Sequence, residues 1–155
     1  MVADERKAAV YVAFNTFQTA LETLNQGLPP RIDTSVWPNL AGGVRGHLIT
    51  AFKFLGLIDA DGDVRPDLER LVVAKADHRK AVLREIIERS YPLIVEIGQT
   101  NASSMQLAEA MREYNVKGDT LEKAVRFYLQ AAAYCGLPVS RLWKKSKGAR
   151  RGGER

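Results

Sequence analysis

Hydrophobic residues recur at spacings of three and four along most of the chain, which is the period of an amphipathic helix. In the first such stretch, from Lys7 to about Gln26, one face carries Val10, Phe14, Phe17, Leu21 and Leu24. Similar patterns predict a short helix over residues 33–40 and longer helices over 44–55, from 67 onward, and over 78–98, 104–114 and 120–135. The sequence therefore predicts a mainly α fold.

The pattern changes after Gly56, where short apolar segments replace the helical period. Leu57-Ile58-Asp59 and Val64-Arg65 flank an Asp61-Gly62 pair. Asp-Gly between short apolar segments is a strong signal for a hairpin turn. We therefore predict one small β-hairpin here. Three helices followed by a hairpin is the order of elements in a winged helix.

Capping and helix-breaking residues mark where the predicted helices begin and end. Ser35 is placed to cap the short second helix, and Gly42-Gly43 should form a flexible joint before the third. Pro92 lies inside the 78–98 stretch, so we expect a kink or break near Ser90-Tyr91. Ser103 or Ser104 should cap the next helix, and Thr120 should open the last.

The two halves of the chain resemble each other. The segment 51–57 can be laid against 131–137, a shift of 80 residues from Gly56 to Gly136. Each copy ends a helix with an apolar turn, a Gly and a Leu, although many unrelated helices end in this way. We expect a winged-helix-like lobe over 1–76 and a second helix-turn-helix-like lobe over 77–140, sharing one core, with a basic disordered tail over 141–155.

Basic charge is concentrated in the tail. The chain carries a formal net charge of +5, while residues 141–155 alone hold seven Lys or Arg and one Glu, a net +6, which leaves about −1 for residues 1–140. A tail of this kind could bind phosphates or an acidic partner, or serve only to keep the protein in solution. The whole chain has a single cysteine, Cys135, and lacks a signal-peptide pattern. These two features predict a cytoplasmic protein.

The sequence contains no pattern typical of catalysis, cofactor binding or metal binding. Counted from Asp59 as in a calcium-binding EF-hand, the Gly and Glu positions hold Val64 and Arg70. The glycines at 42–46 lack the Lys-Ser/Thr ending of a nucleotide loop, and His47 and His78 have no ligand-type neighbours. We therefore predict a protein that is not an enzyme, with no cofactor and no small-molecule ligand.

Several segments resemble a prokaryotic family known only as a domain of unknown function. They are residues 11–14, 27–33 and 51–59, with 127–132 and 136–140 resembling that family's closing segment. The similarity covers about residues 8–140 and leaves the tail outside. It implies winged-helix-like halves and carries no catalytic motif.

Two functions follow as expectations. The first is a DNA-binding regulator or accessory protein, with basic residues around the predicted reading helices and in the tail. These residues are Arg31, Arg45, His47 and Lys53, then Lys117, Lys123 and Arg126, and in the tail Lys144, Lys145, Lys147, Arg150 and Arg151. The second is a protein-interaction or dimerisation scaffold, because the acidic residues around the hairpin would repel DNA phosphates. Neither function involves a membrane.

Overall fold

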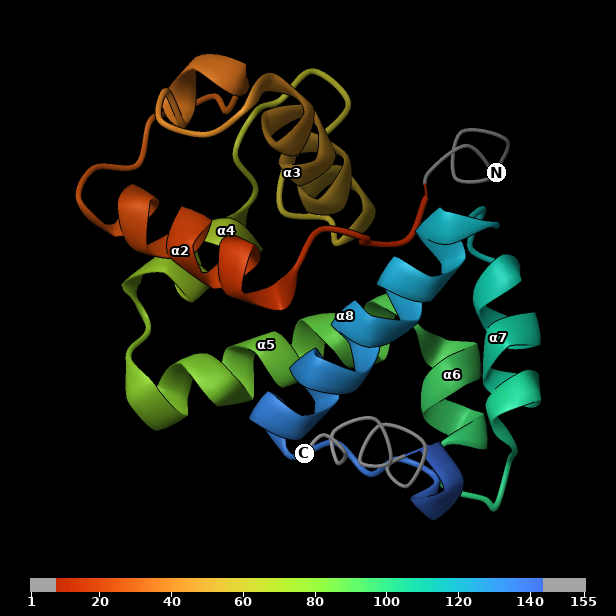
Figure 1. Ribbon diagram of the computed structural model, residues 1–155. Helices are drawn as coiled ribbons and strands as arrows, with labels where there is room; N and C mark the ends of the chain where they lie inside the picture. The colour runs from red at the N-terminus through yellow and green to blue at the C-terminus, as the bar shows by residue number, and fades with distance from the viewer. Residues whose placement is uncertain (1–7, 144–155) are drawn as a thin grey trace, which may run out of the picture.

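The computed structural model describes residues 8–143, and within them the chain is mainly helical (Figure 1). The elements are α2 (Phe14–Asn25), the 3-10 helix η1 (Thr34–Val36), α3 (Gly42–Phe54), α4 (Pro66–Val73), α5 (Ala76–Ser90), α6 (Pro92–Ile97), α7 (Ser104–Arg112) and α8 (Asp119–Cys135). The predicted α class is confirmed. No helix among the described residues combines the length and the apolar character that crossing a membrane requires.

Helix α8 is the centre of the packing. It contacts α2, α5 and α7, and Figure 1 shows it crossing α5 with α7 at its side. Phe127 of α8 packs against Phe14 and Phe17 of α2, with ring centroids 5.7 and 5.5 Å apart. The buried hydrophobic residues form one cluster that extends over the predicted boundary at residues 76 and 77, where α4 packs on α5.

The segment before α2 is extended, so the prediction of a helix from Lys7 was wrong at its N-terminal end. Residues 8–13 are not helical, and α2 begins at Phe14. The backbone N–H of Ala9 donates to the Tyr114 carbonyl at 2.9 Å, and that of Val10 donates to the Tyr91 hydroxyl at 3.3 Å. These long-range bonds replace the helical ones and place the segment between α3 and α8 (Figure 1). Val10 is buried as its spacing predicted, but from an extended backbone.

The predicted β-hairpin was also wrong, since no strand forms among residues 8–143. The chain does turn at Asp61-Gly62, but only isolated bridges form, between Ile58 and Val64 and between Arg31 and Asp63. The turn itself occupies most of the stretch after Gly56, and Pro66 then starts α4. Too little chain is left for a ladder of paired residues.

Two smaller predictions also differ from the structure. The carboxylate of Asp33, rather than Ser35, caps η1 by accepting the Ser35 N–H at 2.9 Å. Gly42 and Gly43 are the first residues of α3 and not a joint before it, because Ala41 already adopts the extended N-cap conformation.

Other local predictions are confirmed. The helix break falls at Tyr91, between α5 and α6, and Ser103 forms a full capping box with Gln106 at the start of α7. Gly56 and Gly136 end α3 and α8 with positive φ angles of 74° and 77°.

Candidate nucleic-acid interface

The end of α3 and the end of α8 are built alike. The N–H of Leu57 donates to the Phe52 carbonyl at 2.9 Å, and that of Leu137 donates to the Ala132 carbonyl at 2.9 Å. The 80-residue offset also relates the buried positions, which are 48, 51, 52 and 55 in the first helix with its cap and 128, 131, 132 and 135 in the second. The C-terminal halves of the two helices therefore make equivalent use of their side chains.

The N-terminal halves differ. Leu121, Ala124 and Phe127 of α8 are buried, whereas the positions 80 residues earlier are the exposed Ala41, the half-buried Val44 and the exposed His47. The neighbours that cover this half of α8 are α2 and α7. The first two turns of α3 are contacted by η1 but are less buried, with Ala41, Gly42, Gly43 and His47 exposed.

Three glycines lie on this open half of α3, at positions 42, 43 and 46. A Cβ atom built on Gly43 or Gly46 would have no neighbour within 4 Å. Nothing inside the described molecule therefore requires glycine there, although glycine in a helix interior costs about 0.5–1 kcal/mol relative to alanine. We call residues 42–47, which are the N-terminal part of α3, the Open half.

Arg31 and Arg45 both lie near η1 but are held by different groups. The Arg31 Nε donates to the Asp61 carbonyl at 2.9 Å, which draws this side chain onto the acidic turn. An Arg45 Nη1 lies 3.5 Å from the Thr34 carbonyl, at the limit of a hydrogen bond, and its Nε is buried without a hydrogen-bond partner among the described residues. Arg45 is thus turned partly toward η1 and away from the outer face of α3.

His47 and Lys53 lie on other sides of the same helix. The His47 ring packs edge-on against Tyr11 of the N-terminal segment, with centroids 4.8 Å apart. Lys53 is in the last turn of α3, where a positive charge is favourable beside the helix C-terminus. The four basic residues predicted in this half surround α3 without forming a single patch.

The basic residues predicted in the second half lie around the start of α8. Lys117 precedes the helix, while Lys123 and Arg126 lie three residues apart on its exposed face. Arg126 also lines a groove of about 600 Å³ between α7 and α8. The tail residues Lys144, Lys145, Lys147, Arg150 and Arg151 lie outside the residues that the structure describes.

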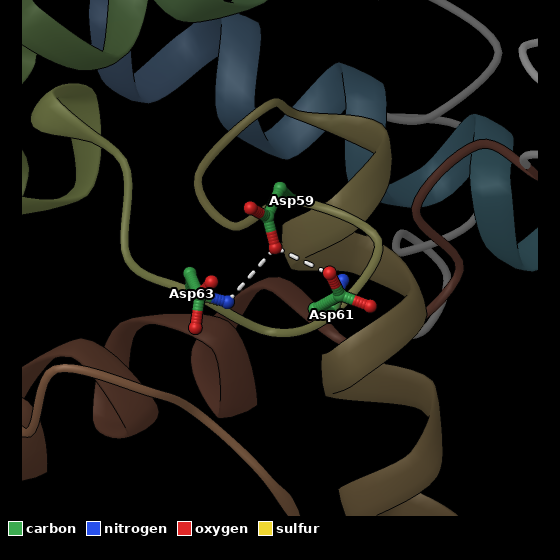
Figure 2. Close-up of side chains that lie close together, drawn as sticks. All are labelled: Asp59, Asp61 and Asp63. Atoms are coloured by element: carbon green, nitrogen blue, oxygen red, sulfur yellow. Dashed lines mark hydrogen bonds between the residues drawn. The ribbon is translucent and has the colours of Figure 1, made fainter.

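The acidic turn beside Arg31 is an internally bonded structure. Carboxylate oxygens of Asp59, Asp61 and Asp63 lie within 4.8 Å of one another, a spacing at which carboxylates can ligate a hard cation. Figure 2 shows that the Asp59 carboxylate points into the turn, where its Oδ1 accepts the backbone N–H groups of Asp61 and Asp63, each at 2.9 Å. These two bonds fix the turn, and they leave the exposed carboxylates of Asp61 and Asp63 as negative charges at its surface.

Sequence reasoning missed the residues that anchor the C-terminal end of α3. An Arg89 Nη2 of α5 donates to the Leu55 carbonyl at 2.7 Å, and its other Nη pairs with Asp67 of α4. The hydrogen bond from Arg89, followed by that from Arg70, holds the pKa of Asp67 below 3.8 against the opposing effect of burial. Similarly, Arg84 of α5 donates to the Gly136 carbonyl at 3.1 Å. No local pattern reveals the bonds of Arg84 and Arg89, because each joins residues far apart in the chain.

The thiol of Cys135 is a poor candidate for chemistry. Burial raises its pKa to about 12, so it stays protonated at neutral pH. A protonated thiol is a weak nucleophile.

Comparisons of the chain with protein-family models, with curated proteins and with solved structures found no match. The resemblance to a prokaryotic family of unknown function therefore stays a prediction, and the function has to be inferred from the residues alone.

Proposed function

We propose that this protein is a DNA-binding regulator or accessory protein that is not an enzyme and that uses the Open half of α3 as its reading surface. The observation that carries the proposal is the contrast between α3 and α8. Recognition helices touch base edges and phosphates with their N-terminal residues. The first two turns of α3 are only partly covered, by η1 and Tyr11, whereas the matching positions of α8 are buried.

The order of elements around α3 supports a winged-helix-like lobe. The chain runs from α2 through Arg31 to η1 and α3, and then through the two arms of the Asp59–Asp63 turn. Arg31 forms an isolated β-bridge with Asp63, and Ile58 forms one with the next residue, Val64. This order is the one expected of a winged helix, with isolated bridges at the places where its strands would pair.

The glycines support close approach of another molecule. Backbone without side chains lets a phosphate or a base edge come near the helix, and the N-terminal N–H groups of a helix attract anions. The basic tail would add affinity that does not depend on DNA sequence and that falls steeply with salt.

A substitution on the Open half tests the proposal. Gly46→Ala should stabilise the fold by about 0.5–1 kcal/mol, because alanine is the better helix former and the new methyl group is unobstructed. Gly46→Leu should keep the fold but weaken binding to a short duplex by about tenfold or more, since its side chain would hold the DNA away. Binding is measured by fluorescence anisotropy at two salt concentrations, and folding by urea denaturation.

The matched control is Ala133→Leu, which adds similar bulk at an exposed position of α8. It should leave binding unchanged. Equal binding by the Gly46→Leu and Ala133→Leu variants would exclude α3 as the reading helix.

Charge substitutions examine the same surface. Arg45→Ala should weaken binding by about 1–3 kcal/mol if its guanidinium contacts a base, whereas Asp61→Asn with Asp63→Asn should leave binding unchanged or slightly stronger. An indifferent Arg45 together with essential Asp61 and Asp63 would point to a partner with a basic surface.

The alternative function is a protein-interaction scaffold. The observation that favours it is the groove between α7 and α8, where Leu107, Val125, Leu129 and Trp143 present a largely apolar lining. If this alternative holds, any binding to DNA is non-specific attraction of charges. Variants of α3 that keep the charge, such as Gly46→Leu, then leave DNA binding unchanged. Leu129→Glu, rather than Gly46→Leu, would then abolish self-association of the protein, which is measured by analytical ultracentrifugation.

A further inference from the structure

The groove between α7 and α8 has a buried apolar floor and half-buried apolar walls. Leu107, Leu121 and Trp143 line it and are buried. Val125 and Leu129 of α8 line it as well and are half-buried. Because Leu121, Val125 and Leu129 are four residues apart, they form one stripe along α8. This stripe leaves apolar surface in contact with water.

A neighbouring stripe of α8 carries one charge of each sign. Glu122 and Arg126 both line the groove and are one helical turn apart. Both are exposed, and neither forms an ion pair with another residue between 8 and 143. A surface that presents an unpaired acid and an unpaired base in this way is complementary in charge to a second copy of itself.

Met105 of α7 adds an apolar side chain at the edge of the groove. It follows Ser104 and lies one turn before Ala108, and both of those residues line the groove. At 70% exposure it is the most exposed large hydrophobic side chain among residues 8–143. Methionine is flexible and adapts to irregular apolar surfaces, which suits it to a contact with another molecule.

We propose that two copies of this chain associate through the groove between α7 and α8 and form a symmetric dimer. Helices α7 and α8 of one copy pack against the same two helices of the other, as in a four-helix bundle. The two-fold axis passes near Val125, so α8 runs antiparallel to its equivalent and Leu121 lies opposite Leu129 of the second copy. Because both copies contribute the same surface, association stops at two.

This arrangement also pairs the charges of the groove. With the axis at Val125, Glu122 and Arg126 of the second copy lie about 3 Å apart along the helix direction, at about 1.5 Å per residue. The two-fold axis brings the same flank of each α8 to the same side of the contact. Two pairs between Glu122 and Arg126 therefore form, one on either side of the axis.

The dimer goes beyond the proposed DNA-binding function and does not depend on it. One consequence does rest on that function. A dimeric DNA-binding protein presents two reading surfaces related by the two-fold axis, so its target would be an inverted repeat.

Reversing single charges tests the dimer on the full chain without nucleic acid. The wild-type chain should form dimers at micromolar concentrations in sedimentation-equilibrium measurements. Glu122→Arg alone and Arg126→Glu alone each place like charges across the axis, so each should weaken self-association by about tenfold or more. An equimolar mixture of these two variants should form a mixed dimer within about threefold of the wild-type affinity, because each chain then supplies both charges of one sign.

The mixture distinguishes a contact between copies from pairing within one helix. If Glu122 and Arg126 stabilised only their own helix, mixing the two variants would restore nothing. Lys75→Glu is the control, because it changes the net charge as Arg126→Glu does but at an exposed position before α5. It should leave self-association unchanged.

Met105→Gln tests the apolar part of the same surface. It should weaken self-association by about threefold or more and leave urea denaturation of the monomer unchanged, since the side chain is exposed. The proposal is overturned by a wild-type chain that stays monomeric, by a mixture that forms no dimer, by equal effects of Lys75→Glu and Arg126→Glu, or by an indifferent Met105→Gln.

DNA binding is measured separately from sedimentation. A wild-type dimer that binds no DNA would refute the proposed function and leave the dimer standing. A monomer that binds a short duplex would refute the dimer and leave the proposed function standing.

Discussion

Helices α3 and α8 end in the same way but begin in different surroundings. Both stop at a glycine with positive φ, both place the following leucine inside the core, and both receive an arginine of α5 near the last carbonyl. Only α8 is buried along its first half as well. The residues at the end of a helix therefore determine how the helix stops. The elements packed around the helix determine whether its other residues are buried or exposed.

The difference lies in which part of each helix α2 covers, because α2 packs on Phe127 in the first half of α8 but on Phe52 near the end of α3. Phe14 and Phe17 of α2 close over Phe127, which occupies the position that His47 has in α3. His47 is exposed and packs edge-on against Tyr11 of the N-terminal segment. Paired substitutions in the two helices test this contrast, and their expected effects range from several kcal/mol to less than one.

The first pair compares matched positions in the two helices. Phe127→Ala should lower the free energy of unfolding by about 3–5 kcal/mol, because it removes a buried aromatic ring and leaves a cavity. His47→Ala should change it by no more than about 0.5 kcal/mol, as expected for a surface position. Urea denaturation of both variants gives the values. Similar losses would show that the first half of α3 is as well packed as that of α8.

The second pair compares the two helix ends. Gly136→Ala should cost about 1–2 kcal/mol from the left-handed backbone alone, since its Cβ would meet nothing within 4 Å. Gly56→Ala should cost more than Gly136→Ala, because its Cβ would lie 3.2 Å from an Arg89 nitrogen and disturb the bond to Leu55. Thermal or urea denaturation measures the loss of stability in both variants. A smaller loss for Gly56→Ala than for Gly136→Ala would contradict the anchoring of α3 by Arg89.

A third, smaller loss of stability concerns the arginine anchor of α3. Because the pKa of Asp67 is lowered in the folded state, its carboxylate adds stability above the ordinary value of 3.8, and this stability is lost as the pH falls through the lowered value. Asp67→Asn should cost about 0.5–1 kcal/mol at neutral pH, a value reduced by the exposure of Arg89. The difference between wild type and variant should vanish in strong acid. A difference that persists at low pH would assign the loss to packing instead.

Local signals in the sequence predicted several helix ends and one helix start. Pro92 marks the break after α5, Ser103 with Gln106 caps α7, and Gly56 and Gly136 mark helix ends. Each of these signals acts within a few residues, through a missing N–H, a side-chain cap or a left-handed backbone. Such effects can be read from one sequence.

Features that depend on distant partners could not be predicted. Val10 fits the helical pattern of α2, yet the segment before Phe14 is extended because Tyr91 and Tyr114 bond its backbone. Asp61-Gly62 does form a turn, but Ile32 bonds the Gly62 carbonyl and the arms stay too short for strands. The candidate site has the same limit. The sequence shows which residues are basic, whereas tertiary packing determines that the Open half is only partly covered and that Arg45 turns toward η1.

The N-terminal segment has a consequence for how the chain is made. Ala9, Val10 and Val12 leave the ribosome before the residues that bury and bond them, since Tyr91 and Tyr114 are synthesised much later. Chains are synthesised from the N-terminus at about 5–20 residues per second. The segment therefore waits several seconds for the residues that bury and bond it.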